Sequence, residues 1–395
     1  MAEFDLAALL APLSVEEFHR TCWGKDFRHV QGTPGRFSPL LPWTALNSIL
    51  EQHRLEAPRL RLTREGKTLA PDLYASLHTN HKRPGQKVPR LRGADLTREL
   101  REGATLVLDA VDELHPPVTD LVESLERMFR VRVQVNAYAG WRTSHGFDVH
   151  WDDHDVFILQ VYGRKNWKVY GMTRTYPLGK DVVPTKDIPK TPLWEGTLED
   201  GDLLYIPRGW WHVATPLDEP TLHLTVGVNN PTAADMLTWF AEQLKASEIV
   251  RQDLPHFANP DQQRDFLNRL WQSVTAAWTP DLMHNYLAHL DANATPRPHL
   301  NLPFGATPEA LPPIGTPFRV RWNGARPVAM EKDEKEVRLS AGGQRWRFAA
   351  AAAPVLESLG SGKIIASSDP ATGLDPVTLR AFLRELVLSG LVVVV

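Results

Sequence analysis

Residues 150–162 read HWDDHDVFILQVY, a group of potential metal ligands that runs directly into an apolar strand. Successive side chains of an extended chain point to opposite faces, so His150 and Asp152 share one face. A second histidine, His212, follows the strand-like segment Leu203–Ile206. Two imidazoles and one carboxylate form the facial triad that holds non-haem Fe(II) in oxygenases. We therefore interpret His150, Asp152 and His212 as candidate metal ligands.

An H-x-D pattern alone is weak evidence for a metal site. The chain has 15 histidines and 47 acidic residues, so chance matches are expected. The alternative is a solvated loop, because Asp148, Asp153, His154 and Asp155 crowd the same stretch. The apolar strand that follows, and the aromatic residues around both histidines, favour the metal site.

The region around these ligands has the pattern of a β domain. Apolar or alternating segments are bounded by turn residues, and they cover Val131–Val135, Val156–Tyr162, Trp167–Tyr170, Leu203–Ile206 and Thr221–Val228. Many short strands separated by turns predict an all-β barrel or sandwich.

Helical periodicity on both sides of these strands makes the fold class α+β with a mainly β core. Residues Thr232–Asn293 have helical spacing, and the proline-rich Ala294–Pro317 is typical of a linker. The last segment contains a hairpin signal at 341–343 and a helix that starts at Pro376. This order of elements resembles a winged-helix module.

The bulk composition excludes several classes of protein. The 395 residues suffice for two or three domains, and a formal net charge of −3 gives no general basic field for nucleic acid or membranes. The single cysteine, Cys22, excludes a disulfide framework or a thiolate zinc site within one chain. A reducing, cytoplasmic location is the expectation. No apolar run reaches the length of a membrane span.

A buried cation near the metal is the next candidate. An Fe(II) oxygenase that uses 2-oxoglutarate must hold the distal carboxylate of that molecule, and a lysine on a buried strand supplies the charge. Lys165 has a suitable place after Gly163, but Arg164 and Lys168 compete for the same role. Spacing alone leaves these three residues open, and an exposed hairpin lysine is the structural alternative.

Taken together, these motifs resemble a known family. The pattern N-A-Y at 136–138, the stretch 150–160, G-R-K-N-W at 163–167 and P-R-G-W-W-H at 207–212 look like the JmjC-type cupin oxygenases. The nearest branch is the ribosomal oxygenases, which hydroxylate arginyl or histidyl residues of ribosomal proteins. The resemblance covers nearly the whole chain and implies a double-stranded β-helix barrel, Fe(II) and 2-oxoglutarate.

The resemblance also implies roles for individual residues. His150, Asp152 and His212 match the iron ligands and hence the catalytic centre, and Lys165 matches the residue that binds the far carboxylate of 2-oxoglutarate. Asn136 and Thr225 are expected at the cofactor, and Tyr138, Arg142 and Trp211 at the substrate. His223 is interpreted as a core histidine. The segment 142–147 and Pro216 depart from the family pattern, which puts the substrate in doubt more than the chemistry.

The family layout implies three domains. Residues 1–230 are expected to form the barrel domain with an α/β extension, 231–315 a helical dimerisation region, and 316–395 the winged helix. The partners would be a protein or peptide substrate and a second copy of the chain. Direct binding of nucleic acid is not expected, because the helix 376–388 carries only Arg380 and Arg384 as cations.

Two other functions stay open. The same scaffold can hydroxylate a free or carrier-bound amino acid or a peptide natural product. A non-catalytic cupin that serves as a binding module is the alternative from another class, and the triad together with Lys165 argues against it. Demethylation of a histone-like substrate fits the whole-chain layout less well.

Overall fold

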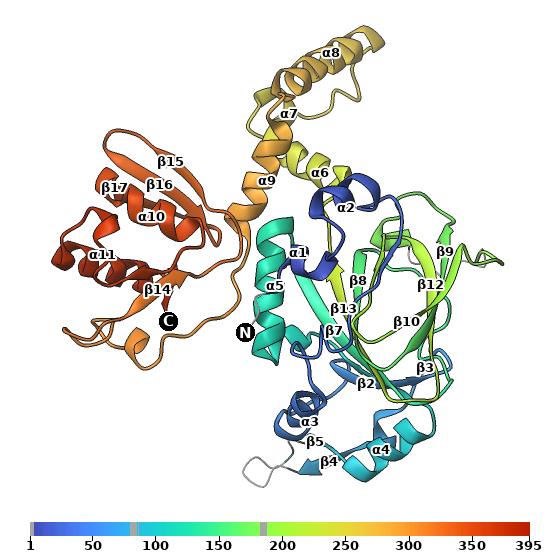
Figure 1. Cartoon of the computed structure of the whole chain (residues 1–395). Helices are drawn as coiled ribbons and strands as arrows, with labels where there is room; N and C mark the ends of the chain where they lie inside the picture. The colour runs from blue at the N-terminus through green and yellow to red at the C-terminus, as the bar shows by residue number, and fades with distance from the viewer. Residues whose placement is uncertain (1–3, 80–84, 86, 182–187) are drawn as a thin grey trace. The chain divides into compact units, whose positions relative to one another are not determined.

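The computed structural model describes residues 4–79, 85, 87–181 and 188–395 (Figure 1). The chain divides into two compact units, Met1–Asn230 and Pro231–Val395, and each is described by itself. Within the described ranges, no helix combines the length and apolar character required to cross a membrane.

The first unit contains the predicted β barrel. An antiparallel sheet of eight strands has the order β1-β11-β8-β13-β7-β6-β2-β3, and a second sheet has the order β10-β9-β12. The strands of the large sheet are β1 (Arg28–Val30), β2 (Leu60–Arg64), β3 (Lys67–Thr68), β6 (Thr105–Leu108), β7 (Val133–Gly140), β8 (Asp155–Tyr162), β11 (Leu203–Ile206) and β13 (Thr221–Val228). The second sheet contains β9 (Lys165–Met172), β10 (Trp194–Leu198) and β12 (Trp210–Pro216), while β4 (Ala75–Thr79) and β5 (Lys87–Leu91) form a separate hairpin.

The two faces of the large sheet have different neighbours. On β7, β8 and β13 every second residue, such as Val135, Phe157 and Leu224, is fully buried in a core that also contains Phe18 and Leu121 of the helices. The alternate residues face the second sheet, as strand periodicity requires. Val156 and Ile158 pack there against Trp167 and Val169 of β9 in a smaller cluster. The barrel interior is therefore separate from the main core.

Helices cover the outer face of the large sheet (Figure 1). The helices of this unit are α1 (Leu6–Leu10), α2 (Val15–Thr21), α3 (Trp43–Gln52), α4 (Gly93–Arg101) and α5 (Pro116–Phe129), with 3-10 turns at Pro71–Leu73, Val111–Glu113 and Gly179–Asp181. Helix α5 begins with proline in its first turn and buries Leu121 and Leu125. It ends at Phe129, and the C-cap residue Arg130 has a left-handed φ of 56°. These helices pack against the outer face of the large sheet, so its inner face borders the barrel interior.

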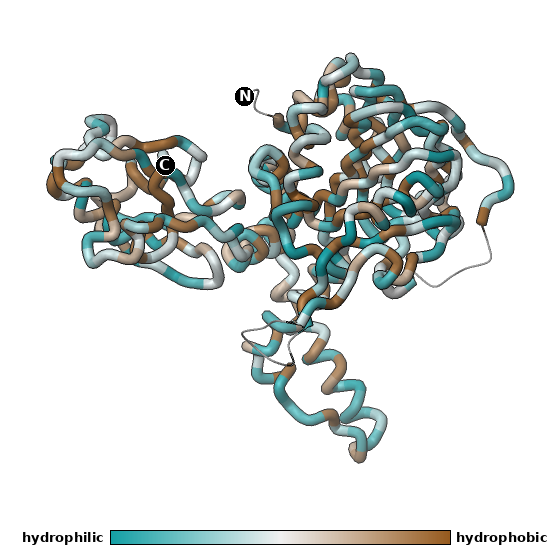
Figure 2. The backbone as a smooth tube through the Cα atoms, turned by 90° about the horizontal axis from the view of Figure 1, so that it is seen from below, coloured by the Kyte–Doolittle hydropathy of each residue, from teal (hydrophilic) through white to brown (hydrophobic). Residues whose placement is uncertain are grey.

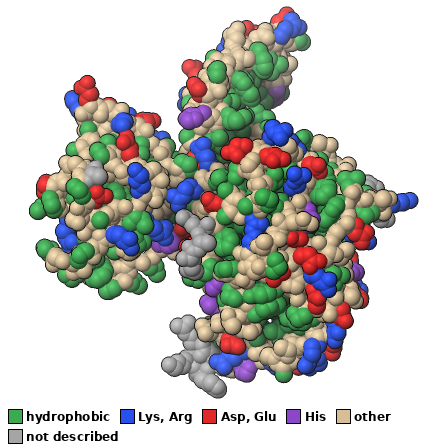
Figure 3. Space-filling view, in the orientation of Figure 1, with side chains coloured by type: hydrophobic (Ala, Val, Ile, Leu, Met, Phe, Trp, Pro, Cys, Tyr) green, Lys and Arg blue, Asp and Glu red, His purple; other side chains and the backbone are tan. Residues whose placement is uncertain are grey.

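The second unit begins with four helices and continues into small sheets. The helices are α6 (Ala233–Leu244), α7 (Glu248–Arg251), α8 (Pro260–Ala277) and α9 (Leu282–Asn293), and hydrophobic positions recur along them (Figure 2). Capping boxes at Thr232 and Asn259 start α6 and α8. Several large apolar side chains of this segment are exposed, as Figure 3 shows over α8.

The C-terminal part of this unit has its own core of buried residues, including Val320, Leu356 and Leu383. Its elements are β14 (Arg319–Trp322), β15 (Ala329–Lys332), β16 (Glu336–Ala341), β17 (Gln344–Ala349), α10 (Ala353–Gly360), β18 (Ile365–Ala366), α11 (Pro376–Leu388) and β19 (Val392–Val394), with 3-10 turns at Phe304–Ala306, Ala350–Ala352 and Pro370–Thr372. One sheet has the order β18-β14-β19 and the other β15-β16-β17. The predicted hairpin and the helix that starts at Pro376 are both present.

Candidate metal centre

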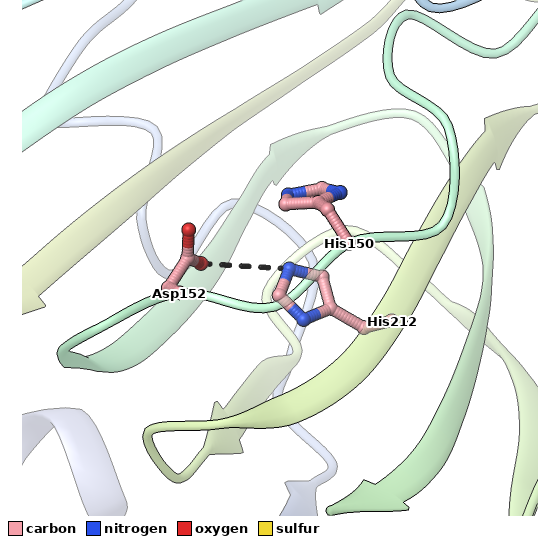
Figure 4. A group of neighbouring side chains, drawn as sticks. All are labelled: His150, Asp152 and His212. Atoms are coloured by element: carbon pink, nitrogen blue, oxygen red, sulfur yellow. Dashed lines mark ion pairs between the residues drawn. The ribbon is translucent and has the colours of Figure 1, made fainter. Parts of the chain in front are cut away.

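The three predicted ligands meet at one end of the barrel (Figure 4). His150, Asp152 and His212 each offer a ligand atom, and these atoms all lie within 4.8 Å of one another. The Nε2 atom of His212 is 3.5 Å from an Oδ atom of Asp152. The spacing and the donor set fit one divalent ion held from one side. The structure therefore brings together the three side chains that the sequence predicts as ligands.

Backbone hydrogen bonds join the two segments that carry the ligands. The N–H of His150 donates to the carbonyl of His212 (3.1 Å), and the N–H of His212 donates back to His150 (2.8 Å). A third bond joins the N–H of Gly209 to the carbonyl of Asp152 (2.9 Å). His212 lies inside β12, which pairs with β9. The sequence pattern predicts only that His212 follows the strand Leu203–Ile206, and it does not predict β12.

Each imidazole is oriented by a backbone carbonyl. The Nδ1 atom of His150 lies 2.8 Å from the carbonyl oxygen of Asp148, and that of His212 lies 3.0 Å from the carbonyl oxygen of Trp210. A carbonyl only accepts, so Nδ1 carries the proton in both rings. In the neutral form of such a ring, Nε2 keeps its lone pair and can bind a metal.

The charges of the cluster suit a cation. Burial, together with neighbouring His150, lowers the pKa of His212 to about 4, so this imidazole is neutral at pH 7. Burial alone would raise the pKa of Asp152, but the His212 and His150 rings bring it below its usual value. A neutral His212 imidazole beside an ionised Asp152 carboxylate can bind a metal without first losing a proton.

Lys165 occupies the other end of the same barrel interior. It opens β9 and lies opposite Pro216 of β12, while His212 lies opposite Val169 on the same two strands. Burial lowers the pKa of Lys165 to about 7, and among the described residues no carboxylate pairs with it. A buried cation without a counter-charge is costly, so it is a strong sign of an anionic ligand.

The competing cations are placed elsewhere. Arg164 is about half exposed and pairs with Glu219, with an N–O distance of 3.0 Å. Lys168 is 40% exposed and pairs with Glu195. Because both already have a carboxylate partner at the surface, only Lys165 of the three turns into the barrel.

Aromatic rings line the interior between the metal ligands and Lys165. The rings of Tyr138 and His223 are stacked 4.9 Å apart, and the edge of Trp167 meets His223 at 5.5 Å. The Trp167 ring lies 6.1 Å from that of His212. The buried Nε1 of Trp167 and Nδ1 of His223 have no hydrogen-bond partner among the residues that the structure describes. Two unpaired buried polar atoms near Lys165 fit a polar ligand in this space.

The remaining predicted residues differ in their surroundings. Asn136 and Thr225 lie opposite each other on β7 and β13, and Oδ1 of Asn136 accepts from the N–H of Ala110 (3.0 Å). Arg142 is exposed and pairs with Asp218. Trp211 is buried, and its Nε1–H donates to Thr173 (2.9 Å).

Sequence reasoning missed two residues of this region. Trp167 was read only as part of a strand, and Asp155 was grouped with the acids of a solvated loop. Asp155 is in fact 5% exposed and begins β8. Its signal was the immediate start of the apolar run at the next residue, which places it inside the fold.

The fold and the site together define a β-barrel protein with a two-histidine, one-carboxylate cluster, and comparison with known proteins gives the class. Residues 114–236 match the model of the JmjC domain family. The crystal structure of the Escherichia coli ribosomal oxygenase YcfD superposes with a TM-score of 0.57 at 18% identity, covering 97% of this chain and 98% of that one. The overall fold is therefore that of a JmjC cupin protein.

Curated relatives make the likeness more particular. Ribosomal oxygenase 1 of Gallus gallus is 31% identical over 224 residues, which is 55% of this chain and 35% of that protein. The bifunctional lysine-specific demethylase and histidyl-hydroxylase NO66 of Drosophila pseudoobscura pseudoobscura is 29% identical over 263 residues, 63% of this chain and 25% of that protein. The matches span about a quarter to a third of these relatives. The resemblance to JmjC ribosomal oxygenases is confirmed.

Proposed function

We propose that this protein is an Fe(II)- and 2-oxoglutarate-dependent oxygenase that hydroxylates an aliphatic C–H bond of an amino-acid residue in a protein. A ribosomal protein is the favoured substrate. The observation that carries the proposal is that the barrel interior holds both the His150–Asp152–His212 cluster and the buried Lys165, which has no carboxylate partner among the described residues. A structure of YcfD in complex with cobalt and 2-oxoglutarate supports the choice of ligands.

One end of the barrel would bind the metal, and the other end would bind the far carboxylate of 2-oxoglutarate. His150, Asp152 and His212 would hold the metal from one side and leave the opposite side open to 2-oxoglutarate and oxygen. Fe(II) bound there supplies the oxidative chemistry, which the protein itself cannot provide. Lys165 would pair with the far carboxylate, and that pairing would favour its protonated form and raise its pKa.

Trp167 and His223 would complete the floor of the pocket. The indole N–H of Trp167 would donate one hydrogen bond, Nδ1 of His223 would donate or accept one according to its tautomer, and both rings would keep water away from the carboxylate. Asn136 and Thr225 would border the 2-oxoglutarate on the large sheet. Tyr138, Arg142 and Trp211 would contact the substrate.

The partners follow from exposed surfaces of the second unit. In the helical region 231–315, Leu267, Trp271, Trp278 and Met283 are more than half exposed. Trp271 and Trp278 border a pocket of about 390 Å³. Large exposed apolar patches mark contact surfaces. We propose that this region forms a homodimer and that residues 316–395, a winged helix, support protein contacts rather than nucleic acid. A cytoplasmic location fits such a protein.

The experiment is a turnover assay with the metal-reconstituted protein. Anaerobic loading with Fe(II) is followed by 2-oxoglutarate, oxygen and a panel of ribosomal proteins and free amino acids. Mass spectrometry should find one added oxygen on a ribosomal protein, with succinate formed in equal amount. His150→Ala is the control.

The possible results separate the alternatives. Hydroxylation of a free amino acid with no ribosomal product would favour the second function, a small-molecule or natural-product hydroxylase. Succinate no higher than the His150→Ala control with every substrate would reject the enzyme proposal. Light scattering of wild type and Trp271→Glu tests the dimer, which the variant should dissociate.

A further inference from the structure

Asp155 is a buried carboxylate that none of the roles above uses. It begins β8, three positions after Asp152, and only 5% of it is exposed. One oxygen accepts the N–H of Arg208 (2.9 Å) and the hydroxyl of Tyr205 (3.2 Å). The other oxygen accepts from the side-chain amide of Asn230. The three hydrogen bonds to the carboxylate thus all come from neutral groups, and the Arg208 charge adds a smaller electrostatic contribution.

The Arg208 N–H belongs to the turn that delivers His212. Residues Pro207–Trp210 form this turn, closed by a bond from the Trp210 N–H to the Pro207 carbonyl (3.3 Å). Gly209 has a φ of 82°, which is the third position of a type II turn. A side chain at Gly209 would collide with Pro177. His212 follows two residues after the turn ends, so the angle of the turn sets where the imidazole points.

The Asp155 bond ties that turn to the start of β8, which directly follows the segment that carries His150 and Asp152. The turn already has its own closing bond and a bond from Gly209 to the Asp152 carbonyl. A further bond to a buried carboxylate is unnecessary for a type II turn, and burial of that carboxylate carries a desolvation penalty. This unfavourable burial has a physical reason if the Asp155 bond fixes the orientation of His212 relative to Asp152, which metal binding requires.

We propose that Asp155 is a positioning residue of the metal centre, which fixes His212 against His150 and Asp152 through the Arg208 backbone. The inference rests on the proposed metal-dependent function, because it requires that the cluster binds a metal. It predicts that loss of the Asp155–Arg208 bond weakens metal binding without disturbing the rest of the barrel.

The turn allows a test that removes only one hydrogen bond. Arg208 is the second residue of the type II turn, where proline is common. Arg208→Pro therefore deletes the N–H donor and keeps the turn, while Arg208→Ala loses the same side chain and keeps the N–H. Asp155→Ala deletes the acceptor, and Asp155→Asn keeps an oxygen for the Arg208 N–H.

The readout is Co(II) titration of the full-length, metal-free protein, followed by its visible absorption, with thermal melting of the metal-free form alongside. Removal of a group that orients metal ligands weakens metal binding roughly 10- to 100-fold. We expect that loss for Arg208→Pro and Asp155→Ala, with an altered Co(II) spectrum. Arg208→Ala should match wild type, and Asp155→Asn should recover most of the affinity.

Equal Co(II) affinity and spectrum for Arg208→Pro and Arg208→Ala would overturn the proposal, even if Asp155→Ala fails to fold. A lower melting temperature with an unchanged Co(II) spectrum and affinity would also overturn it, since that is the result of a purely structural role. A wild-type protein that binds no Co(II) would instead reject the proposed function, and this inference with it.

Discussion

The two faces of the large sheet use the same strands for opposite purposes. On the outer face, residues such as Val135, Phe157 and Leu224 are fully buried among other apolar side chains. On the inner face, Tyr138 and His223 alternate with them, and Lys165 on the opposing sheet has no counter-charge among the described residues. Neighbouring residues of one strand therefore face either the apolar core or the barrel interior that contains the candidate site.

The two faces also differ in how they affect the stability of the folded chain. The outer face buries apolar surface, which stabilises the folded chain. The barrel interior, between the inner face and the second sheet, contains buried Lys165 and the polar atoms of Trp167 and His223, which have no partners among the described residues; this is unfavourable until a ligand binds. Changes on the outer face should thus affect folding, and changes on the inner face should affect function.

The largest effect is expected at the metal ligands. His212→Ala or Asp152→Ala removes one of three ligand groups, so Co(II) binding and succinate formation should fall to background. The melting temperature of the metal-free protein should change by only a few degrees, because neither side chain belongs to the main core. Calorimetry and a succinate assay measure both. Normal turnover in either variant would contradict the assigned triad.

Phe157→Ala tests the opposite face of the same sheet. The ring is fully buried and packs against Phe18 and Tyr205, with ring centres 5.6 and 5.0 Å apart. Its truncation should lower the free energy of unfolding by about 3–5 kcal/mol. Urea unfolding measures the loss, and Co(II) affinity of the folded protein should stay at the wild-type value. A variant of normal stability that binds metal poorly would reverse the assignment of the faces.

Lys165→Met is expected to raise stability while it removes 2-oxoglutarate binding. Burial lowers the pKa of Lys165 to about 7, from 10.5 in the unfolded chain. Between these values the unfolded state holds more protons, so wild-type stability rises with pH over that window. The variant lacks this dependence. It should exceed wild type most at pH 6, by on the order of a few kcal/mol, and least above pH 10.

Thermal melts of the ligand-free proteins at pH 6 and pH 9.5 test the sign. A larger gain at pH 9.5 than at pH 6 would mean that Lys165 is stabilised by a partner in the free protein. Lys165→Arg is the matched control, since it keeps the charge and the unfavourable burial.

The smallest effect is expected for Arg142→Ala. Its pair with Asp218 is more than half exposed, so the free energy of unfolding should change by less than about 1 kcal/mol. If Arg142 contacts the substrate, KM rises while kcat is retained. Arg164→Ala, which breaks a similar surface pair with Glu219, is the control. Equal KM values for the two variants would remove Arg142 from the substrate site.

The sequence predicted the strands that have an unambiguous pattern. The bounds of β11 and β13 match the expected Leu203–Ile206 and Thr221–Val228, and β8 differs by one residue. Apolar runs between turn residues carry this information locally. Strand β12 was missed because Trp210–Pro216 begins with two tryptophans and ends in proline, which is neither a clear alternation nor an apolar run.

The sequence pattern indicates the three candidate metal ligands, but it does not determine which other side chains surround them. The choice of Lys165 over Arg164 and Lys168 depends on the residue at which β9 starts, since that fixes which side chains face inward. Sequence spacing does not determine this start. The stacking of Tyr138, His223 and Trp167 joins three strands that are distant along the chain, so only the folded structure brings them together.

An irregularity in the pairing of β12 with β9 has a consequence for changes in chain length. Trp210 lies opposite Met172 but His212 lies opposite Val169, so β9 contains one extra residue there. This bulge determines which side chains of the following strand residues face the barrel interior. Deletion of one residue between Val169 and Met172, or insertion of one between Trp210 and His212, would exchange inward and outward positions. Substitutions can alter this site gradually, whereas a single-residue insertion or deletion would turn a ligand out of it.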